Sequence, residues 1–453
     1  MGHTLAAEKE QDERCQKAYT NHLSQVNESR NVIASQDIYN AQGILLIKKG
    51  AVIDERAAKK IVQYKLLKPL EEDVTVENTI DGRQLFNFIM QGIDSEDDFG
   101  LLHQSLNIED ELKEYCLVYG SYPMLVQKLT VLSIQLPKEF MGGLLSAYNS
   151  LAIARKLHMD FESKKIVFLA GLLHDIGMLH IDPKIVKKVG KYTPEEWRTM
   201  QAHTVIGQKI LSNIPKLPPL VAQAVLEHHE RTDGAGYPKG AMEPQLSHEG
   251  QIVAMSDTLF AIYSNKLRKQ GRFYSDLIPI MQMNSTLHFY PIYEAWVQIM
   301  RAAELPDKRA TDDEDIPTLI DDLIKNFYYF LGVYEMTDPL LKIFPKNYKD
   351  YKQLAIVFNM AERLYSIISS NGILQKEHRD WLIKVKKEQL VDEYIEIERT
   401  ALIHAELRWQ IQQSNQVLHL ILTDHPTLDQ IYLDNIKFLI GKHQETEQEH
   451  GAK

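Results

Sequence analysis

Five of the 17 histidines in this 453-residue chain fall within residues 174–229: His174, His180, His203, His228 and His229. The first of them follows the apolar run "FLAGLL", and Asp175 stands directly beside it. A carboxylate at the end of a buried helix loses its hydration and needs a countercharge. A divalent cation supplies that charge and also accepts an imidazole nitrogen as a ligand. His174 and Asp175 are therefore predicted metal ligands at the end of an apolar helix.

His203 lies in a segment whose start has a helical signature. Thr193 is an expected N-cap, Pro194 suits the first helical position, and Glu196 completes a capping box. The apolar residues that follow recur at helical spacing, and His203 lies beside them. A buried histidine needs a hydrogen-bond partner or a metal, so His203 is a candidate ligand.

Three more candidates lie at or beside apolar helical stripes. His228 and His229 end the segment "PPLVAQAVLE", and neighbouring residues on a helix point about 100° apart. We therefore expect the two rings to face different ways, serving either one metal each or a metal and a substrate. Asp257 borders the apolar stripe of "GQIVAMSDTLF", where it is either exposed or paired inside.

Each of these positions alone is more typical of a core residue with a hydrogen-bond partner. An isolated His-Asp dipeptide also carries little information. Together, they place several imidazoles and carboxylates at or beside the inner faces of helices within residues 174–257. That combination indicates a metal site. The alternative is a set of separate histidines, each with its own partner in the core.

The elements that position these residues are mostly helices. Residues 31–53 are the exception, because apolar β-rich stretches at 32–33 and 44–47 flank the turn "YNAQG" and predict a hairpin. Helical spacing follows at 54–67 and from residue 82 onward, so the predicted fold is mainly α. The predicted segments are a polar helix or tail at 1–30, a small β-containing domain at 31–80, a helical connector at 81–134, a histidine-rich domain at 135–275, a helical extension and charged linker at 276–316, a C-terminal helical domain at 317–442 and a disordered tail at 443–453.

Composition and charge exclude several classes of protein. A net charge of −11 argues against nucleic acid polymers and anionic membranes as partners, although a local pocket for a small phosphorylated ligand is compatible with it. The two cysteines, Cys15 and Cys116, provide neither a disulfide framework nor a thiolate zinc site, which fits a reducing cytosol. The sequence shows no secretory signal and no apolar run of ~20 residues. We therefore expect a cytoplasmic protein without membrane insertion.

The stretch "HHERTDGAGYP" at residues 228–238, together with "LLHDIG" upstream, resembles the HD-GYP family, a branch of the HD phosphohydrolases. The resemblance covers about residues 135–275. It implies an HD-type helical bundle that holds two or three divalent metals, often iron or manganese. It also implies hydrolysis of cyclic di-GMP to the linear dinucleotide pGpG or on to GMP.

Carried over by position, the resemblance assigns roles to particular residues. The implied metal ligands are His174, Asp175, His203, His228, His229 and Asp257, of which the first two also count as catalytic. Asp175 is implied to bridge the metals. The implied substrate-binding loop contains Arg231, Asp233, Gly236, Tyr237 and Pro238. Carboxylates and imidazoles without thiolates suit two iron or manganese ions, which would activate water and neutralise charge on a phosphodiester.

Two positions depart from the family pattern. The family has another histidine ligand on the helix before the HD motif, whereas this chain has Gly142 at or near that position and no histidine between His103 and His158. The family motif HDIGK reads "HDIGM" here. Met178 therefore replaces a lysine that contacts phosphate, and methionine has no donor to replace that contact.

These observations leave two main functions open. The first is a metal-dependent cyclic di-GMP phosphodiesterase, of reduced activity because one histidine ligand and the lysine are missing. The second is a catalytically degenerate protein that acts as a cyclic di-GMP receptor or signalling scaffold, with protein partners at the GYP loop or the C-terminal helices. A different HD phosphohydrolase that acts on another phosphoester is a third alternative.

Overall fold

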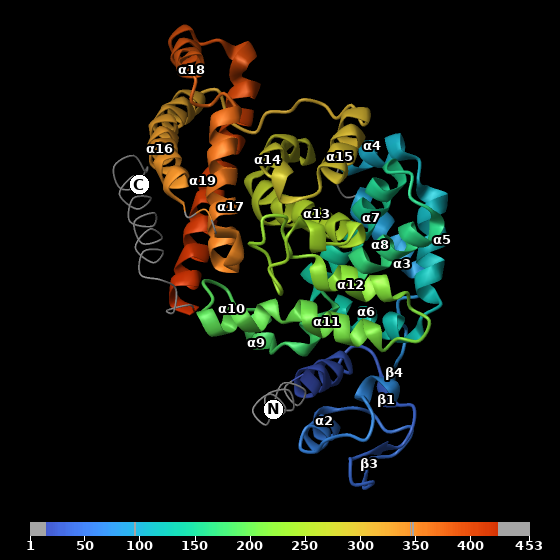
Figure 1. The fold of residues 1–453 in the computed structure, drawn as a ribbon. Helices are drawn as coiled ribbons and strands as arrows, with labels where there is room; N and C mark the ends of the chain where they lie inside the picture. The colour runs from blue at the N-terminus through green and yellow to red at the C-terminus, as the bar shows by residue number, and fades with distance from the viewer. Residues whose placement is uncertain (1–14, 95–96, 345, 347, 425–453) are drawn as a thin grey trace. The chain divides into compact units, whose positions relative to one another are not determined.

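The computed structural model describes residues 15–94, 97–344, 346 and 348–424, and these residues form two compact units. The first unit comprises residues up to 230 with 246–261 and 294–303, and the second comprises 231–245, 262–293 and the residues from 304 onward. Both units are mainly helical, as predicted, and within the described residues the strands are confined to the N-terminal part of the first unit (Figure 1). The predicted domain boundaries stay a prediction. Each of the two units is made of several separate segments of the chain, so the units do not correspond one to one to the predicted domains.

Short strands and one helix form the β-containing part of the first unit. The elements are β1 (Val32–Ala34), β2 (Ile38–Tyr39), β3 (Leu45–Ile47), α2 (Glu55–Ile61) and β4 (Val74–Val76). β1 pairs with β4 and β2 pairs with β3, both antiparallel. The expected partner of the segment at 44–47 was therefore wrong, because the strand at 32–33 pairs with β4 instead.

The turn sequence itself behaves as predicted. The side chain of Asn40 accepts hydrogen bonds from the backbone nitrogens of Gln42 and Ile44, and Gly43 has a φ of 76°. These bonds close the turn directly after β2, so the hairpin begins there and not six residues earlier. Helix α2 is shorter than the predicted 54–67, and it starts where Asp54 caps the backbone nitrogen of Ala57.

The remainder of the first unit is a bundle of helices. Its elements before the HD motif are α3 (Gly82–Asp94), α4 (Asp97–Leu106), α5 (Glu109–Gly120), α6 (Pro123–Gln135), α7 (Pro137–Lys156) and α8 (Phe161–Leu173). After the motif come η2 (Ile176–His180), α9 (Pro183–Val186), α10 (Pro194–Gln201), α11 (His203–Ser212), α12 (Pro219–Glu227), α13 (His248–Ile262) and most of α15 (Tyr290–Ala302).

Helices α7 and α8 approach each other closely because two glycines lie between them. A Cβ on Gly143 would lie 2.5 Å from the carbonyl oxygen of Leu172, and one on Gly171 would lie 2.9 Å from that of Ser146. Any larger residue would force the backbones apart. The close packing fixes the C-terminal end of α8, where the HD motif begins.

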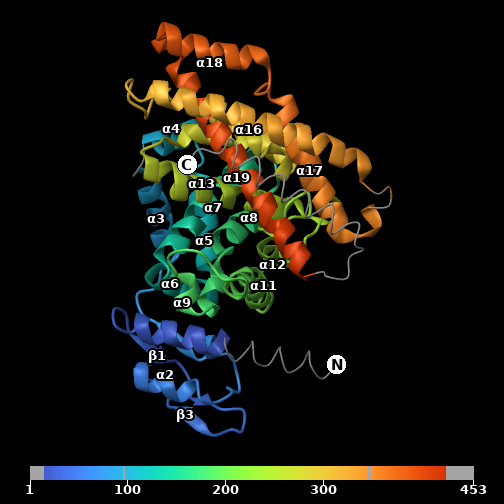
Figure 2. The same ribbon diagram turned by 90° about the vertical axis from the view of Figure 1, so that its left-hand side faces the viewer.

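The second unit contains the short helix α14, followed by longer helices towards its C-terminal end. They are α14 (Leu277–Met283), α16 (Ile316–Ile343), α17 (Lys352–Ser370), α18 (Lys376–Glu388) and α19 (Tyr394–Asp424). Helices α16, α17 and α19 lie side by side (Figure 2). Apolar side chains from α14, α16, α17 and α19, among them Met283, Phe330, Leu364 and Leu407, form one buried core. The same unit contains the loop 231–245, which carries the GYP motif.

Some predictions concern residues outside this description. Residues 15–26 are helical, which agrees with part of the predicted N-terminal helix, but residues 1–14 lie outside the described chain. The predicted tail at 443–453 and the end of the C-terminal domain also lie outside it. Among the helices that the structure describes, none combines the length and the apolar character needed to cross a membrane.

Candidate metal centre

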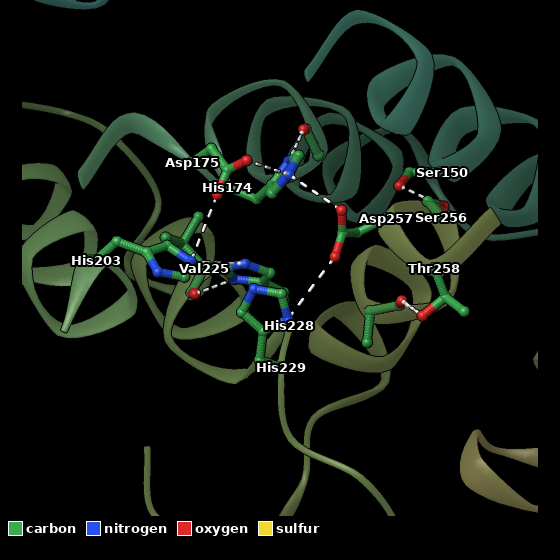
Figure 3. A network of polar contacts seen from close by, with 12 residues as sticks. Ser150, His174, Asp175, His203, Val225, His228, His229, Ser256, Asp257 and Thr258 are labelled. Atoms are coloured by element: carbon green, nitrogen blue, oxygen red, sulfur yellow. Dashed lines mark hydrogen bonds and ion pairs between the residues drawn. The ribbon is translucent and has the colours of Figure 1, made fainter. Parts of the chain in front are cut away.

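The six predicted metal ligands converge in the first unit, although they come from four separate parts of the chain (Figure 3). Their positions are the end of α8 for His174 and Asp175, the first residue of α11 for His203, the end of α12 for His228 and His229, and the body of α13 for Asp257. The three histidines His174, His203 and His228 are each at most 1% exposed. The structure therefore brings together residues that the sequence only placed on separate helices.

Helix ends explain why several of these residues can face one another. The predicted capping box of Thr193 and Glu196 is present, but the expected single helix breaks at Ala202 into α10 and α11. His203 is consequently the first residue of a new helix. A Cβ on Gly177 would lie 2.0 Å from the carbonyl oxygen of His203, so only glycine lets this helix start approach the turn after the HD motif.

The rings of His228 and His229 do not diverge as the helical spacing suggested. Their centroids are 4.0 Å apart, and the ring of His203 lies 5.3 and 5.1 Å from them. The physical reason is that α12 ends at Glu227, so the two histidines follow the helix and are not both inside it. One nitrogen from each of these three rings lies within 4.8 Å of the others.

Backbone carbonyls orient three of the rings. Nδ1 of His174 donates to the carbonyl oxygen of Gly171 at 2.8 Å, Nδ1 of His203 donates to that of Met200 at 2.6 Å, and Nδ1 of His228 donates to that of Val225 at 2.6 Å. Because a carbonyl only accepts, the proton of each neutral ring is on Nδ1, and the lone pair on Nε2 faces the cluster. Histidine ligands of metals are commonly held by such a bond.

The carboxylates lie between these rings. Asp175 has one oxygen 3.3 Å from Nε2 of His174 and the other 3.4 Å from Nε2 of His203. Asp257 has one oxygen 3.5 Å from Nε2 of His174 and the other 3.8 Å from Nδ1 of His229. Each carboxylate thus faces two different histidines, which is the arrangement that a bridging ligand needs.

Among the described residues, no lysine or arginine forms an ion pair with either carboxylate of the cluster. Burial lowers the pKa of His174, but the adjacent Asp175 and Asp257 outweigh it and raise that pKa well above the ordinary value. The pKa of His228 lies far below its ordinary value, because burial and the neighbouring His174 and His203 lower it. In the described part of the chain, imidazoles are the ion-pair partners of both carboxylates. The buried Nε2 of His174 makes no hydrogen bond within that part.

The donor set fits divalent metal ions. His203 and His228 face each other through their Nε2 atoms at 3.3 Å, a contact in which two lone-pair-bearing nitrogens meet. Two groups of three potential ligands form, one with His203, His228 and His229 and the other with His174, Asp175 and His228. Nitrogen and carboxylate oxygen without sulfur suit iron, manganese or zinc.

The two departures from the family pattern have structural counterparts. Gly142 is buried in α7, and a Cβ there would lie 2.9 Å from Cε1 of Phe260. A histidine at this position would therefore collide with the phenyl ring, which fills the space beside α7. Met178 is buried in η2, with 8% of its surface exposed.

Glu139 is a neighbour of the cluster that the sequence analysis missed. It lies in the first turn of α7, and its pKa is raised by burial and by the Asp175 carboxylate. The signal was weak in sequence, because a glutamate at the start of a helix is typical of favourable helix-dipole placement.

The five predicted substrate-binding residues lie in the loop 231–245 of the second unit. Asp233 is only 7% exposed and accepts a hydrogen bond from the backbone nitrogen of Ala235 at 2.9 Å. Its carboxylate also pairs with Arg363 of helix α17. The side chain of Asp233 is therefore occupied within its own unit.

Comparisons with known proteins match the part of the chain that contains this site. Residues 130–291 match the family model of the HD domain. A cyclic di-GMP phosphodiesterase of Thermotoga maritima is 36% identical over 167 residues, which cover 36% of this chain and 45% of that protein. Cyclic di-GMP phosphodiesterase PA4108 of Pseudomonas aeruginosa is 36% identical over 121 residues, covering 27% and 29%. 3'3'-cGAMP-specific phosphodiesterase 3 of Vibrio cholerae is 31% identical over 157 residues, covering 34% of each chain.

The match and the converging ligands define the class of protein: the chain carries an HD domain, which is a metal-binding domain. Within this match, the sequences "HDIG" and "HHERTDGAGYP" resemble those of the HD-GYP branch of HD-domain proteins. The matched regions span less than half of the length of each of these relatives.

Proposed function

We propose that this chain is a metal-dependent phosphodiesterase that hydrolyses cyclic di-GMP to pGpG or on to GMP. The observation that carries the proposal is the convergence of two carboxylates and four imidazoles in one cluster, in which no lysine or arginine of the described chain is ion-paired with either carboxylate. Two of the similar proteins are named cyclic di-GMP phosphodiesterases, which supports this substrate. Another relative is named a 3'3'-cGAMP-specific phosphodiesterase, so 3'3'-cGAMP is the alternative substrate to test.

The proposed ligands are His174, Asp175, His203, His228, His229 and Asp257, with two iron or manganese ions. Bound metal would supply Lewis-acid stabilisation of the phosphate and lower the pKa of an attacking water. The chain's own contribution is orientation, because backbone carbonyls hold Nδ1 of three histidines and leave Nε2 directed into the cluster. Asp175 would help to hold the ions, since its two oxygens face different histidines.

The loop 231–245 is the proposed substrate-binding element. Arg231 provides a guanidinium that suits a phosphate group, and Tyr237 provides a ring that suits a base. The main-chain atoms of Gly236 and the ring of Pro238 would complete the surface. We also propose a cytoplasmic location, which rests on the low cysteine content of the chain.

The test uses the full chain, loaded anaerobically with Fe(II) or Mn(II). Metal content is measured by mass spectrometry, and products from cyclic di-GMP and from 3'3'-cGAMP are separated by chromatography. We expect close to two metals per chain and formation of pGpG or GMP. His203→Ala should lose metal and turnover together, whereas His180→Gln, a histidine of the same segment outside the cluster, should keep both. A chain that retains no metal under these conditions would show the ligand assignment to be wrong.

A second candidate function is a cyclic di-GMP receptor without turnover. The specific observation in its favour is the packing of Phe260 against Gly142, which leaves no space for the additional histidine that the family has there. Tight metal and measurable nucleotide binding without product would support this receptor. Product formation at a rate that depends on metal content would exclude it.

A further inference from the structure

The loop that carries the GYP motif is held by one face of helix α17. Arg363 donates from Nε to an oxygen of Asp233 at 3.1 Å, and the two side chains are 11% and 6% exposed. Nδ2 of Asn359 donates to the carbonyl oxygen of Asp233 at 3.3 Å. Helix α17 therefore holds the loop at Asp233 through both the side chain and the backbone carbonyl of this residue.

Two further residues of α17 continue this contact towards the start of the helix. Lys352 donates from Nζ to the carbonyl oxygen of Lys239, and a Cβ on Gly234 would lie 3.4 Å from Cγ1 of Ile356. The four contacting positions on α17 are residues 352, 356, 359 and 363. Spacings of three or four residues place all four on one side of the helix, so one face of the first three turns of α17 contacts the loop.

Arg363 also connects the loop to helix α19. Its Nη1 donates to the side-chain oxygen of Gln410 at 2.7 Å. Nε2 of Gln410 in turn donates to the carbonyl oxygen of Met283 and to the side chain of Asn284, both at 3.2 Å. Asn284 donates to Glu406 at 2.9 Å. Gln410, Asn284 and Glu406 are each 2% exposed. The guanidinium therefore belongs to a buried polar network that lies within the second unit.

The physical chemistry of this network makes arginine difficult to replace. A guanidinium presents donors in a fixed planar fork, so one edge serves Asp233 while another nitrogen serves Gln410. A lysine at 363 has a single ammonium and cannot reproduce both directions. Removal of the charge leaves Asp233 buried and unpaired, which is far more costly than removal of both partners.

We propose that Arg363 is a positioning residue that holds the GYP loop in the conformation used for substrate binding. The C-terminal helices would then be part of the catalytic protein and not only a surface for partners. Asp233, predicted from the family resemblance to bind substrate, is assigned to the anchor instead. The consequence for turnover rests on the proposed phosphodiesterase function, whereas the consequence for loop order does not.

The test compares Arg363→Gln, Arg363→Lys and the double variant Asp233→Asn/Arg363→Gln in the full chain. Hydrogen exchange followed by mass spectrometry reports on amides 231–245, and metal content and steady-state kinetics with cyclic di-GMP are measured in parallel. Arg363→Gln should speed exchange in the loop at least about tenfold and raise KM by a similar factor, with unchanged metal content. Arg363→Lys should give a smaller effect, and the double variant should recover part of the loop protection because no buried charge is left alone.

Arg399→Gln is the matched control, since this arginine of α19 pairs with Glu396 and Asp307 at the surface and not with the loop. It should leave loop exchange and KM unchanged. Loop exchange in Arg363→Gln equal to that of the parent chain would overturn the anchor. A KM of active Arg363→Gln equal to that of the parent chain would also overturn the anchor. A parent chain that hydrolyses no cyclic dinucleotide would instead refute the proposed function, and the exchange comparison would still decide the anchor.

Discussion

Two clusters in the first unit contain histidine and carboxylate, and they solve the problem of buried charge differently. In one, Lys128 is 0% exposed and places Nζ 3.0 Å from Glu71, 3.4 Å from Nε2 of His180 and 4.1 Å from the ring centroid of Tyr19. His180 stacks on Tyr19 with centroids 4.9 Å apart. The carboxylate in this cluster has a cation of the protein as its partner.

In the cluster around His174, by contrast, no lysine or arginine of the described residues is ion-paired with a carboxylate. Asp175 and Asp257 face imidazoles, and the pKa of His174 is raised because these two carboxylates outweigh the effect of burial. In the Lys128 cluster, the pKa of His180 shifts in the opposite direction to that of His174. Burial and Lys128 lower the pKa of His180 to about 3, and the pKa of Glu71 falls to about 2 because Lys128 and His180 outweigh its burial.

The difference shows what separates a structural histidine from a candidate ligand in this chain. Both His174 and His180 follow the same apolar helix within seven residues of each other. One belongs to a cluster whose charge is balanced by a lysine, and the other belongs to a cluster whose charge is left for an external ion. The following changes test that division.

The largest expected effect follows from removal of the Asp175 carboxylate, a proposed metal ligand. Asp175→Asn should lower turnover of cyclic di-GMP by at least about 100-fold, because even residues that only support metal ligands contribute 10- to 100-fold to affinity or activity. We expect Mn(II) to raise the Tm of the parent chain, and Asp175→Asn should abolish that rise. Calorimetry with and without metal measures this. An unchanged metal-dependent Tm in Asp175→Asn would show that the carboxylate is not a ligand.

The second change removes the internal cation of the other cluster. Lys128→Met should reduce the free energy of unfolding by about 3 kcal/mol, because it leaves Glu71 as an unpaired carboxylate. Metal content should stay the same. The double variant Lys128→Met/Glu71→Gln should recover part of the lost stability in urea denaturation. A loss of metal in Lys128→Met, with the fold intact by circular dichroism, would contradict the separation of the two clusters.

The Lys128 cluster should make the stability of the metal-free protein depend on pH. The folded pKa of His180 is about 3, below the ordinary 6.5, so the unfolded chain binds the proton first and stability falls as pH drops from about 6.5 towards 3. Glu71 adds a loss from about 4.5 down to 2. His180→Gln should flatten the first part of this curve by about 1–3 kcal/mol. Urea denaturation at pH 7 and pH 5 measures this effect. The same loss of stability between the two pH values in the parent chain and in His180→Gln would refute the lowered pKa of His180.

The smallest expected effect concerns the space beside Gly142. Gly142→His alone should destabilise the fold, since its Cβ would meet Phe260 at 2.9 Å. Gly142→His combined with Phe260→Ala should make room for the ring and tighten metal binding by about tenfold. Competition with a chelator measures the affinity, and Phe260→Ala alone is the control. Equal affinity in the double variant and this control would show that position 142 does not face the metals.

Local signals in the sequence predicted several elements correctly. The capping box at Thr193, the apolar helix before His174 and the helix before His228 all rest on interactions within a few residues, and the structure contains each of them. The end of α12 at Glu227 and the break at Ala202 were missed. Helical spacing alone could not reveal them, because tertiary packing decides where such helices stop.

The partner of the first strand was also missed for a physical reason. The turn "YNAQG" is a local feature and was recognised, whereas β1 pairs with β4, which lies about 40 residues further along the chain. Pairing between distant strands depends on which apolar faces meet in the folded core. Nothing in the two short segments themselves distinguishes one partner from another.

The sequence by itself determined which residue types stand at the ends of apolar helices, and it thereby identified the six candidate ligands and the HD-GYP motif. The tertiary structure alone decided that His180 joins Lys128, 52 residues away, and that Asp233 joins Arg363, 130 residues away. Helix periodicity and caps arise from neighbours in the chain, so sequence reveals them. The countercharge for a buried group can come from any part of the chain, and only packing shows which side chain supplies it.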